Sequence, residues 1–492
     1  MSLEQKAKHR SELSNKRWLV RYAVLGAILS ILAVKFYMML FVLDIVVGAY
    51  SFTTTFVLFS ILLIAYIKYK DPYIKAENLI NLNYTGGPLV TIIVPVKNEE
   101  GYIKRCLQSI INSTYSAKQI IVVNDGSTDQ TPVILDQMHK EYPYLHIIHL
   151  SKTVGKKKAI EMATDIAKGE MYVFMDSDCN MANDAVENAV KIFLSDRKIG
   201  AITAHGRVRD AENGNALKKL QDVWYDGQFR IIKGMESSFS SLTCCSGAFT
   251  AFRRKAIQPY IHAWAHDRFL GREFKFATDR RLTAYVLGAN PPPDKKSPRD
   301  ETQKPDAYSY MSLIYLSMLS TGKDDFESMK RSSDATVAIE DKSRYRWRLK
   351  YSRHVRVYIG PPETFAALIR QQIRWRKSFI RSIFSTGRVY WRRPFFAALL
   401  YYLQLTLKII RPYIVIKSLL LLPLLSSDYY TGSFYVVSII FTGMIYGIDF
   451  RLRNPGTGSQ WLYRPLMTVL STFVFSWLLL YSAINIRRPL WR

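Results

Sequence analysis

Long apolar runs lie near both ends of the sequence, and short strand-like and helix-like patterns alternate between them. Lys35 is the only charged residue in the apolar run 22–43, and residues 46–67 contain no charged residue. About 20 consecutive apolar residues cross a bilayer core as a helix. A cleaved signal peptide has a shorter apolar region and is not followed at once by a second one. The pattern predicts two membrane-spanning helices joined by a short turn, with buried core helices as the alternative.

The C-terminal part contains further apolar stretches, at 395–425, 433–449 and 465–483. The first includes Lys408 and Arg411-Pro412, so it can form one kinked span, a hairpin, or an interfacial helix followed by a span. The number of spans in this part stays open.

Basic residues flank the N-terminal runs, in the tail (KAKHR, NKR) and after the second run (KYK). The positive-inside rule places both flanks in the cytoplasm. Everything from about 70 to 390 is then expected to be cytoplasmic. The basic loop 451–464 has the same expected location.

The region after residue 88 alternates strand-like and helical patterns. The expected strands are 89–96, 119–124, 144–150 and 170–175, and the expected helices are 99–112, 131–142 and 156–168. The strand-like runs are continuously apolar and rich in β-branched residues, as buried parallel strands are. This order predicts an α/β domain with a mostly parallel sheet covered by helices. Ligands on such sheets bind beyond the carboxyl ends of the strands.

Acidic residues follow two of these strands, in Asn124–Asp129 (NDGSTD) and in Asp176-Ser177-Asp178. Residues two apart in an extended chain face the same way, so both carboxylates of DSD can point at one spot. Paired carboxylates favour a hard cation, Mg²⁺ or Mn²⁺, which in turn binds phosphate oxygens. The alternative is that these acidic turns only cap helices.

Three lysines open the third expected helix, in Gly155-Lys156-Lys157-Lys158. Cations at a helix N-terminus oppose the helix dipole, so helix propensity does not explain them. A phosphate group bound at this helix N-terminus would explain these lysines.

Charge and cysteine content narrow the classes of partner. The formal net charge of +28 suits nucleic acid, anionic lipid, or a phosphorylated or polyanionic substrate. No aromatic-basic RNA-binding motif is found, so a membrane-tethered nucleic-acid binder is disfavoured. The four cysteines show no CxxC spacing, which predicts neither disulfides nor a zinc site among them.

Taken in order, VPVKNEE, VVNDGSTD, GKKKA, FMDSD and QQIRW resemble the motifs of the processive membrane glycosyltransferases of family 2. That group includes cellulose, chitin and hyaluronan synthases. TCCSGAFTAFRR (243–254) and QQIRWRKSFIR (371–381) are most similar to segments of the hyaluronan synthases. The resemblance covers about residues 85–390 and the arrangement of apolar runs.

The resemblance implies a GT-A (Rossmann-like) domain that acts on a UDP-sugar. Asp178, helped by Asp176, would hold Mg²⁺ or Mn²⁺ on the diphosphate. The residues expected to bind the nucleotide-sugar are Pro95, Lys97, Glu99, Asp125, Lys156, Asp176, Asp178 and Arg374. The residues expected to bind the acceptor are Gln371, Trp375, Cys245 and Ser246.

By the same resemblance, Asp279 is the catalytic base. It lies in Phe276–Thr283, where hyaluronan synthases usually have glycine-aspartate-aspartate-arginine, and Thr278 replaces the first aspartate. A sugar hydroxyl is a poor nucleophile until a carboxylate takes its proton. One direct displacement of UDP would invert the anomeric centre and give a β-linkage. The alternative role for Asp279 is an ion pair with Arg280 or Arg281.

The stretch 363–382 is expected to be a helix with Gln371, Arg374 and Trp375 on one face. An indole can stack on a sugar ring, and a guanidinium can chelate diphosphate oxygens. An interfacial anchor is the alternative for Trp375. The neighbouring cations suit a helix lying on anionic lipid.

These inferences predict four parts: 1–70 with two transmembrane helices, 71–362 as the glycosyltransferase domain, 363–394 as the amphipathic interface region, and 395–492 with the C-terminal helices. Residues 290–345 are expected to be an insertion.

The predicted activity is polymerisation of UDP-sugars, UDP-GlcNAc and in addition UDP-GlcA, into an exported, hyaluronan-like polysaccharide. The expected partners are these donors, the growing chain and lipids of the plasma membrane, without nucleic acid. A non-processive enzyme that makes a ceramide- or polyprenyl-phosphate-linked sugar is the alternative.

Overall fold

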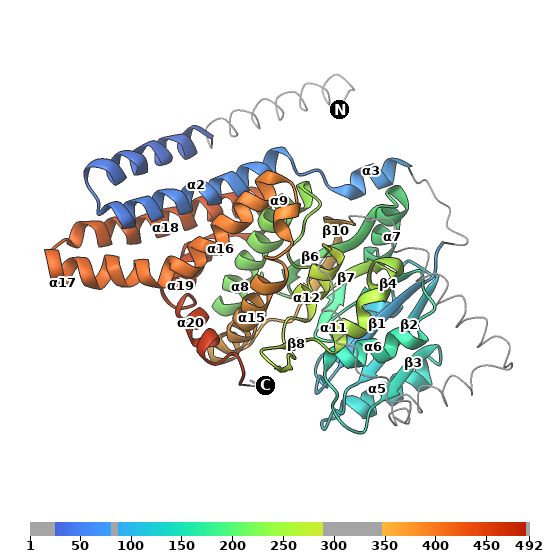
Figure 1. Ribbon diagram of the computed structural model, residues 1–492. Coiled ribbons are helices and arrows are strands. Elements are labelled where there is room, and N and C mark those ends of the chain that lie inside the picture. Colours follow the sequence, from blue (N-terminus) through green and yellow to red (C-terminus); the bar gives the residue numbers. More distant parts are fainter. Residues whose placement is uncertain (1–24, 80–86, 289–346, 489–492) are drawn as a thin grey trace, which may run out of the picture. The chain divides into compact units, whose positions relative to one another are not determined.

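The computed structural model describes residues 25–79, 87–288 and 347–488 (Figure 1). The predicted insertion 290–345 lies outside these residues. The chain divides into two compact units: Met1–Ile67 with Leu400–Trp477, and Lys68–Leu399 with Leu478–Arg492.

An eight-stranded mixed sheet forms the core of the second unit, in the order β3-β2-β1-β4-β7-β6-β10-β5. Its strands are β1 (Val90–Val96), β2 (Lys118–Asn124), β3 (Leu145–His149), β4 (Met171–Phe174), β5 (Cys179–Met181), β6 (Ile199–Val208), β7 (Thr250–Arg253) and β10 (Arg348–Ile359). The four strands predicted from apolar runs are present and mutually parallel. All residues of β1 are buried, because both of its faces are covered.

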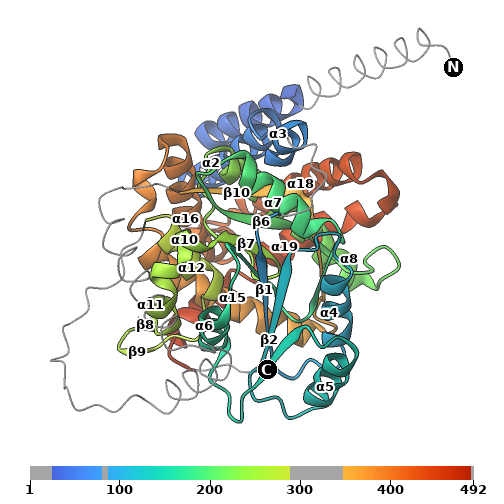
Figure 2. The same cartoon turned by 90° about the vertical axis from the view of Figure 1, so that its right-hand side faces the viewer.

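Helices cover the two faces of the first four strands. The connections are α4 (Ile103–Ile111), α5 (Thr131–Glu141) and α6 (Lys156–Ile166). Figure 2 shows α4 and α5 on one side of β1 and β2, and α6 on the other. The strand order explains this, since the chain steps outward from β1 to β3 and then returns across β1 to β4. The carboxyl ends of β1, β2 and β4 therefore meet at one edge.

The second half of the sheet contains both parallel and antiparallel pairs. β7 runs antiparallel to both β4 and β6, and β10 runs parallel to β6 but antiparallel to β5. Six of the eight strands therefore share one direction, so the prediction of a mostly parallel sheet holds, with β7 and β5 as the antiparallel exceptions. Apolar runs reveal that a strand is buried, but they do not state which neighbour it pairs with or in which direction.

Further helices of the second unit range from short segments to the 21-residue α15. They are α7 (Ala185–Ser195), α8 (Ala216–Asp226), a π-helical segment (Gly227–Lys233), α9 (Gly234–Ser238), α10 (Arg254–Ile257), α11 (Ile261–Ala265), α12 (Thr278–Val286) and α15 (Phe365–Ser385). The side chain of Thr364 accepts a hydrogen bond from the Ala367 N–H (3.2 Å) and so caps α15. This helix includes most of the predicted 363–382.

The other apolar helices are a helix over Leu25–Phe41, α2 (Ile45–Ile67), α16 (Phe395–Ile416), α17 (Leu422–Ser426), α18 (Tyr429–Arg453), α19 (Tyr463–Phe473) and α20 (Trp477–Ile484). By length and composition, three helical stretches of the described residues could cross a membrane: Ile45–Glu77, Phe395–Ser426 and Tyr429–Arg453. The bent pair Gln460–Phe473 and Trp477–Ile484 would make a fourth if it forms one span. Residues 395–425 thus form a continuous helical stretch with Pro412 inside it, and not a hairpin.

Lys35, the charged residue of the first apolar run, is buried within the first unit. Its ammonium group donates hydrogen bonds to the hydroxyl groups of Ser51 (3.1 Å) and Thr55 (2.7 Å) on α2. These bonds compensate for the removal of a charged group from water.

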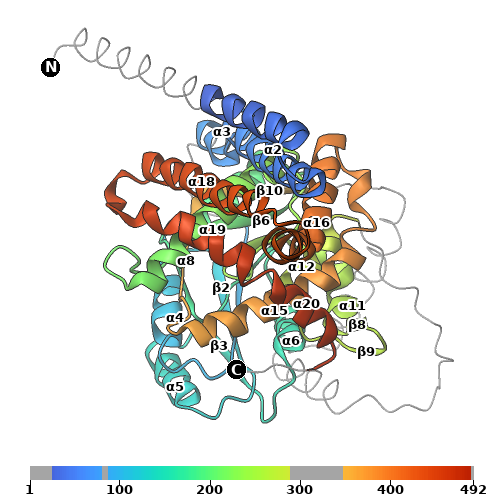
Figure 3. The same cartoon turned by 90° about the vertical axis from the view of Figure 1, so that its left-hand side faces the viewer.

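Small residues let α18 and α19 pack closely side by side (Figure 3). A Cβ atom added to Gly443 would lie 2.6 Å from the Cα of Pro465, and one added to Gly447 would lie 2.8 Å from the carbonyl oxygen of Trp461. Glycines four apart on one helix commonly serve this purpose in membrane helix pairs.

Candidate active site

The loops that follow β1 and β2 are tied to each other. The Asn98 N–H donates to the Ser127 hydroxyl (2.9 Å), and the Asn98 side chain accepts from the Thr128 N–H (2.8 Å). The N–H of buried Glu99 donates to the Thr131 hydroxyl (2.9 Å). These bonds fix the strand ends that carry Pro95, Lys97 and Glu99, three of the predicted nucleotide-binding residues.

Asp125 anchors the turn that begins α6. Its carboxylate accepts hydrogen bonds from the Thr153 hydroxyl (2.9 Å) and from the N–H groups of Val154 (2.6 Å) and Gly155 (3.0 Å). Gly155 has a φ of 93°, a conformation that favours glycine. Asp125 therefore positions the residue that follows, Lys156.

Each of the three lysines at the start of α6 has an acidic partner in the protein. The ammonium group of Lys156 donates to Asp176, that of Lys157 lies 3.6 Å from Asp267, and that of Lys158 lies 3.2 Å from Glu273. Acidic side chains therefore account for Lys157 and Lys158 without a bound phosphate.

Asp176 and Asp178 lie in the turn after β4, as predicted. The ligand atoms of these two carboxylates and of the Cys179 thiol all lie within 4.8 Å of one another. Burial, followed by the charges of Asp178 and Asp176, raises the pKa of Cys179 well above its usual value, so the thiol stays protonated. The remaining donors are carboxylate oxygens, a set that suits Mg²⁺ or Mn²⁺.

Asp279 lies in the first turn of α12, and its carboxylate points at the loop before β7. One oxygen accepts a hydrogen bond from the Gly247 N–H (2.9 Å). A Cβ atom added to Gly247 would lie 2.9 and 3.0 Å from the carboxylate oxygens of Asp279 and 3.1 Å from Oδ2 of Asp176. Two predicted site carboxylates thus converge on one glycine.

The proposed ion pairs of Asp279 with Arg280 or Arg281 are not observed. The Arg281 guanidinium instead contacts Asp267 (3.2 Å), and the Arg280 guanidinium lies 5.9 Å from the centre of the Phe379 ring.

The electrostatics of this cluster keep a proton acceptor next to a cation. Burial raises the pKa of Asp279, the charge of Lys156 opposes this, and the charge of Asp176 adds to it. Burial lowers the pKa of Lys156, but the charges of Asp176 and Asp279 outweigh that effect and raise it overall. Lys156 is therefore charged at neutral pH, and Asp279 takes up a proton more readily than an exposed aspartate.

One pocket brings together predicted residues from four parts of the sequence. Its lining includes Pro95, Lys156, Cys245, Ser246 and Asp279. Burial raises the pKa of Cys245 to about 12, so its thiol is neutral and can act only as a weak hydrogen-bonding or packing group.

Trp375 on α15 belongs to an aromatic cluster with two residues of α8. Its ring stacks on that of Trp224 with 5.3 Å between centroids and 15° between planes. Tyr225 meets Trp375 edge-on at 6.2 Å. Burial raises the pKa of Tyr225, and the charges of Asp178 and Asp176 add to the shift, so this cluster lies within electrostatic reach of the paired carboxylates.

Gln371 and Arg374 are both half-buried on the same helix. Within the part of the chain that the structure describes, Oε1 of Gln371 has no hydrogen-bond partner. A buried polar atom without a hydrogen-bond partner calls for one, and a bound ligand can supply it.

The sequence did not reveal the roles of Gly247, Trp224 or Tyr225. Gly247 lies inside the TCCSGAFT segment, which the motif resemblance had already singled out. Its closeness to the carboxylates of Asp279 and Asp176 follows from the fold and could not be predicted from the segment. The dipeptide Trp224-Tyr225 was a detectable aromatic signal on the amphipathic helix α8.

Residues 91–261 match the sequence model of the family described as glycosyl transferase family 2. The chain contains a family 2 glycosyltransferase domain. The matched segment carries Asp125, Lys156, Asp176, Asp178 and Gly247, whereas Asp279 and α15 lie beyond it.

Curated relatives resemble about half of the chain. The hyaluronan synthase of Streptococcus pyogenes is 28% identical over 244 residues, which are 48% of this chain and 57% of that protein. An N-acetylglucosaminyltransferase of Rhizobium meliloti is 30% identical over 206 residues, 41% of this chain and 48% of that protein. The chain thus spans only about half the length of the relatives it matches.

Among solved structures, a mannosyltransferase from Pyrobaculum calidifontis in complex with GDP-Man and Mn²⁺ has a TM-score of 0.49 and 17% identity, and the match covers 89% of this chain and 98% of that one. The family match and the sheet confirm the fold prediction, an α/β glycosyltransferase domain of GT-A type accompanied by helices long enough to span a membrane.

Proposed function

We propose that this chain is a membrane-embedded, inverting glycosyltransferase that joins sugars from UDP donors into a β-linked, hyaluronan-like polysaccharide and exports it. One observation carries the proposal: Asp279, Asp176 and Lys156 meet beside Gly247 at the edge of the pocket. The family 2 match and the relatives named hyaluronan synthase support the same class of reaction.

Asp279 acts as the general base. The Gly247 N–H fixes one of its oxygens, so the carboxylate keeps its orientation while the other oxygen takes the proton of the acceptor hydroxyl. The raised pKa of Asp279 improves it as a proton acceptor. The hydroxyl oxygen attacks the anomeric carbon, the bond to UDP breaks, and the configuration inverts.

Asp176 and Asp178 would hold Mg²⁺ or Mn²⁺, which supplies positive charge to the departing diphosphate. Lys156 adds a fixed cation at the same place, because its ammonium group contacts Asp176. Arg374 is assigned to the diphosphate as well, with Pro95, Lys97, Glu99 and Asp125 on the nucleotide side.

The acceptor end of the growing polysaccharide packs against Trp375 and its neighbours. Trp224 and Tyr225 hold the indole in one orientation, which favours stacking on a sugar ring. Gln371 offers an unpaired oxygen to a sugar hydroxyl, and Cys245 and Ser246 line the pocket on the acceptor side.

The proposal is tested with purified protein in detergent with Mn²⁺ and radiolabelled UDP-GlcNAc, given alone or with UDP-GlcA, followed by sizing of the product. The Asp279→Asn variant is the control. We expect a high-mass product that needs both donors and disappears in the variant. Transfer of a single sugar to lipid would overturn the polymerase assignment. A chitin-like polymer from one donor would overturn the hyaluronan-like one.

A further inference from the structure

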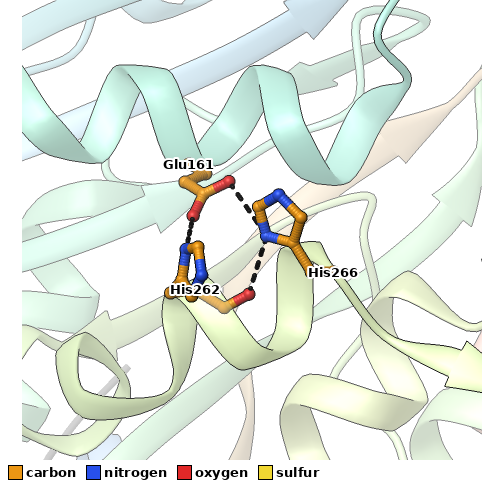
Figure 4. Close-up of side chains that lie close together, drawn as sticks. All are labelled: Glu161, His262 and His266. Carbon is orange, nitrogen blue, oxygen red and sulfur yellow. Dashed lines mark hydrogen bonds and ion pairs between the residues drawn. The ribbon is translucent and has the colours of Figure 1, made fainter. Parts of the chain in front are cut away.

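A second group of side chains of metal-ligating types spans two neighbouring helices (Figure 4). Glu161 lies on α6, and His262 and His266 lie one turn apart at α11. The inner residues of these helices, Ile160 and Trp264, line the pocket, whereas the cluster faces solvent.

The two imidazoles turn toward the same carboxylate. Nδ1 of His262 lies 2.8 Å from one oxygen of Glu161, and Nδ1 of His266 lies 3.7 Å from the other. The ring centroids of the histidines are 4.4 Å apart. One potential ligand atom from each of the three residues lies within 4.8 Å of the others.

Two ligand atoms that each lie about 2.0–2.1 Å from one zinc ion are about 3–4 Å from each other. The cluster is close to that spacing, and the side chains of His262 and His266 are 83% and 46% exposed, so small rotations can complete it. Two imidazoles and one carboxylate suit zinc and its transition-metal neighbours better than Mg²⁺, which prefers oxygen ligands.

The simpler alternative is that a hydrogen bond between a histidine and Glu161 links the two helices. One histidine, His262, is sufficient for such a bond. Here a second histidine approaches the same carboxylate, and its Nδ1 also lies 3.2 Å from the His262 carbonyl oxygen. A divalent ion in place of the shared protons would satisfy all three side chains at once.

We propose that Glu161, His262 and His266 form a binding site for a divalent transition metal of the Zn²⁺ class, separate from the Asp176–Asp178 pair. The bound ion clamps α6 to α11. Because α6 begins with Lys156 and α11 is followed by Asp267, the clamp holds two elements that border the pocket. The cysteine spacing predicts no zinc site among the cysteines and does not bear on the two histidines of HAWAH, His262 and His266.

The test uses the full chain in detergent, with any purification tag removed and bound metal stripped by a chelator. All variants carry Asp176→Asn and Asp178→Asn, which remove the other candidate metal site. One equivalent of Cu²⁺ should then give an electron paramagnetic resonance spectrum with nitrogen couplings. Saturating Zn²⁺ should raise the melting temperature by about 2–4 °C at about 100 times its dissociation constant.

His262→Ala with His266→Ala should abolish both effects. His146→Ala, at an exposed histidine on β3, should leave them unchanged. Glu161→Gln keeps both imidazoles and should weaken Zn²⁺ binding at least about 10-fold, as loss of even an outer partner does. The melting temperatures of the metal-free variants show whether each one is folded.

Absence of nitrogen couplings in the background protein would overturn the proposal, and so would their persistence after both histidines are replaced. Neither result depends on sugar transfer, so the outcome is independent of the proposed glycosyltransferase activity.

Discussion

Asp279 combines a raised pKa with a fixed orientation, and the two properties have different origins. Burial raises the pKa, and the Gly247 N–H sets the direction of the carboxylate. Lys156 lies close enough to moderate the pKa while it balances the negative charge of the cluster.

Replacement of Asp279 by Asn should lower kcat by about 10²–10⁴-fold, the usual contribution of a general base. The Asn carbonyl can still accept from Gly247, so the melting temperature should change little. The measurement is initial rate of sugar transfer at saturating donor.

The pH profile gives an independent check on the same residue. In the proposed mechanism the deprotonated carboxylate is the active form, so kcat should fall as the pH drops through the pKa of Asp279. Because that pKa is raised above its ordinary value of 3.8, the acid limb should lie above the range of an exposed aspartate. Asp279→Glu should keep an acid limb. A profile that is identical in the Asn variant would contradict the assignment.

Gly247 tolerates no side chain where two carboxylates approach it. Gly247→Ala would place a carbon 2.9–3.1 Å from oxygens of Asp279 and Asp176, so at least one carboxylate must move. Displacement by about 1 Å at a reacting group can cost about 10²-fold in rate, and we expect a loss of that order in kcat. Gly101→Ala is the matched control, since nothing lies within 4 Å of its added carbon. Equal activity of the two variants would argue against a role in catalysis for the close approach of Asp279 and Asp176 to Gly247.

At the scale of elements, the buried carboxylate of Asp267 connects three helices of the second unit. Asp267 contacts Lys157 of α6 (3.6 Å), Arg281 of α12 (3.2 Å) and Arg381 of α15 (2.7 Å). Burial lowers the pKa of Lys157 to about 8 even though Asp267 opposes the shift. The helices that carry Lys156, Asp279 and Trp375 thus share one ionic junction.

Asp267→Asn removes the charge that compensates these cations. Breaking a buried ion pair costs about 3–5 kcal/mol, so the variant should unfold at a clearly lower temperature. Asp210→Asn is the control, because Asp210 and Arg105 lie 3.8 Å apart with side chains 65% and 61% exposed, and such pairs contribute at most about 1 kcal/mol. Thermal unfolding in detergent measures both. Equal melting temperatures would show that the junction does not stabilise the fold.

At the scale of the whole molecule, the described residues contain three helical stretches of spanning length and a bent pair. The basic flanks predict that the loop between α18 and α19 lies in the cytoplasm, and hence that the turn before α18 lies outside.

A cysteine placed at Ser459 in that loop should react with a membrane-impermeant maleimide only after permeabilisation. A cysteine at Ser426, just before α18, should react on intact cells. Both serines are exposed, and the variants are made in a chain without the natural cysteines. The reverse labelling pattern would invert the predicted orientation.

The sequence by itself determined the elements whose causes are local. Continuous β-branched runs predicted β1 to β4, helical spacing of apolar residues predicted α4 to α6 and α15, and long apolar runs predicted the candidate spans. Each of these patterns arises because the surroundings of an element, protein core or lipid, select apolar residues along that element itself. The sequence also predicted that the motif residues at the strand ends lie at one edge of the sheet, because the carboxyl ends of parallel strands meet there.

Only the tertiary structure decided what depends on contacts between distant segments. It gave β7 and β5 their antiparallel direction, brought Asp279 against Gly247 and Asp176, assigned Arg281 to Asp267 and stacked Trp375 on Trp224. The three residues of the second metal cluster lie up to 105 positions apart, from 161 to 266. Such pairings leave no periodic trace, because they are set by how packed helices and strands meet and not by the residues beside them in the chain.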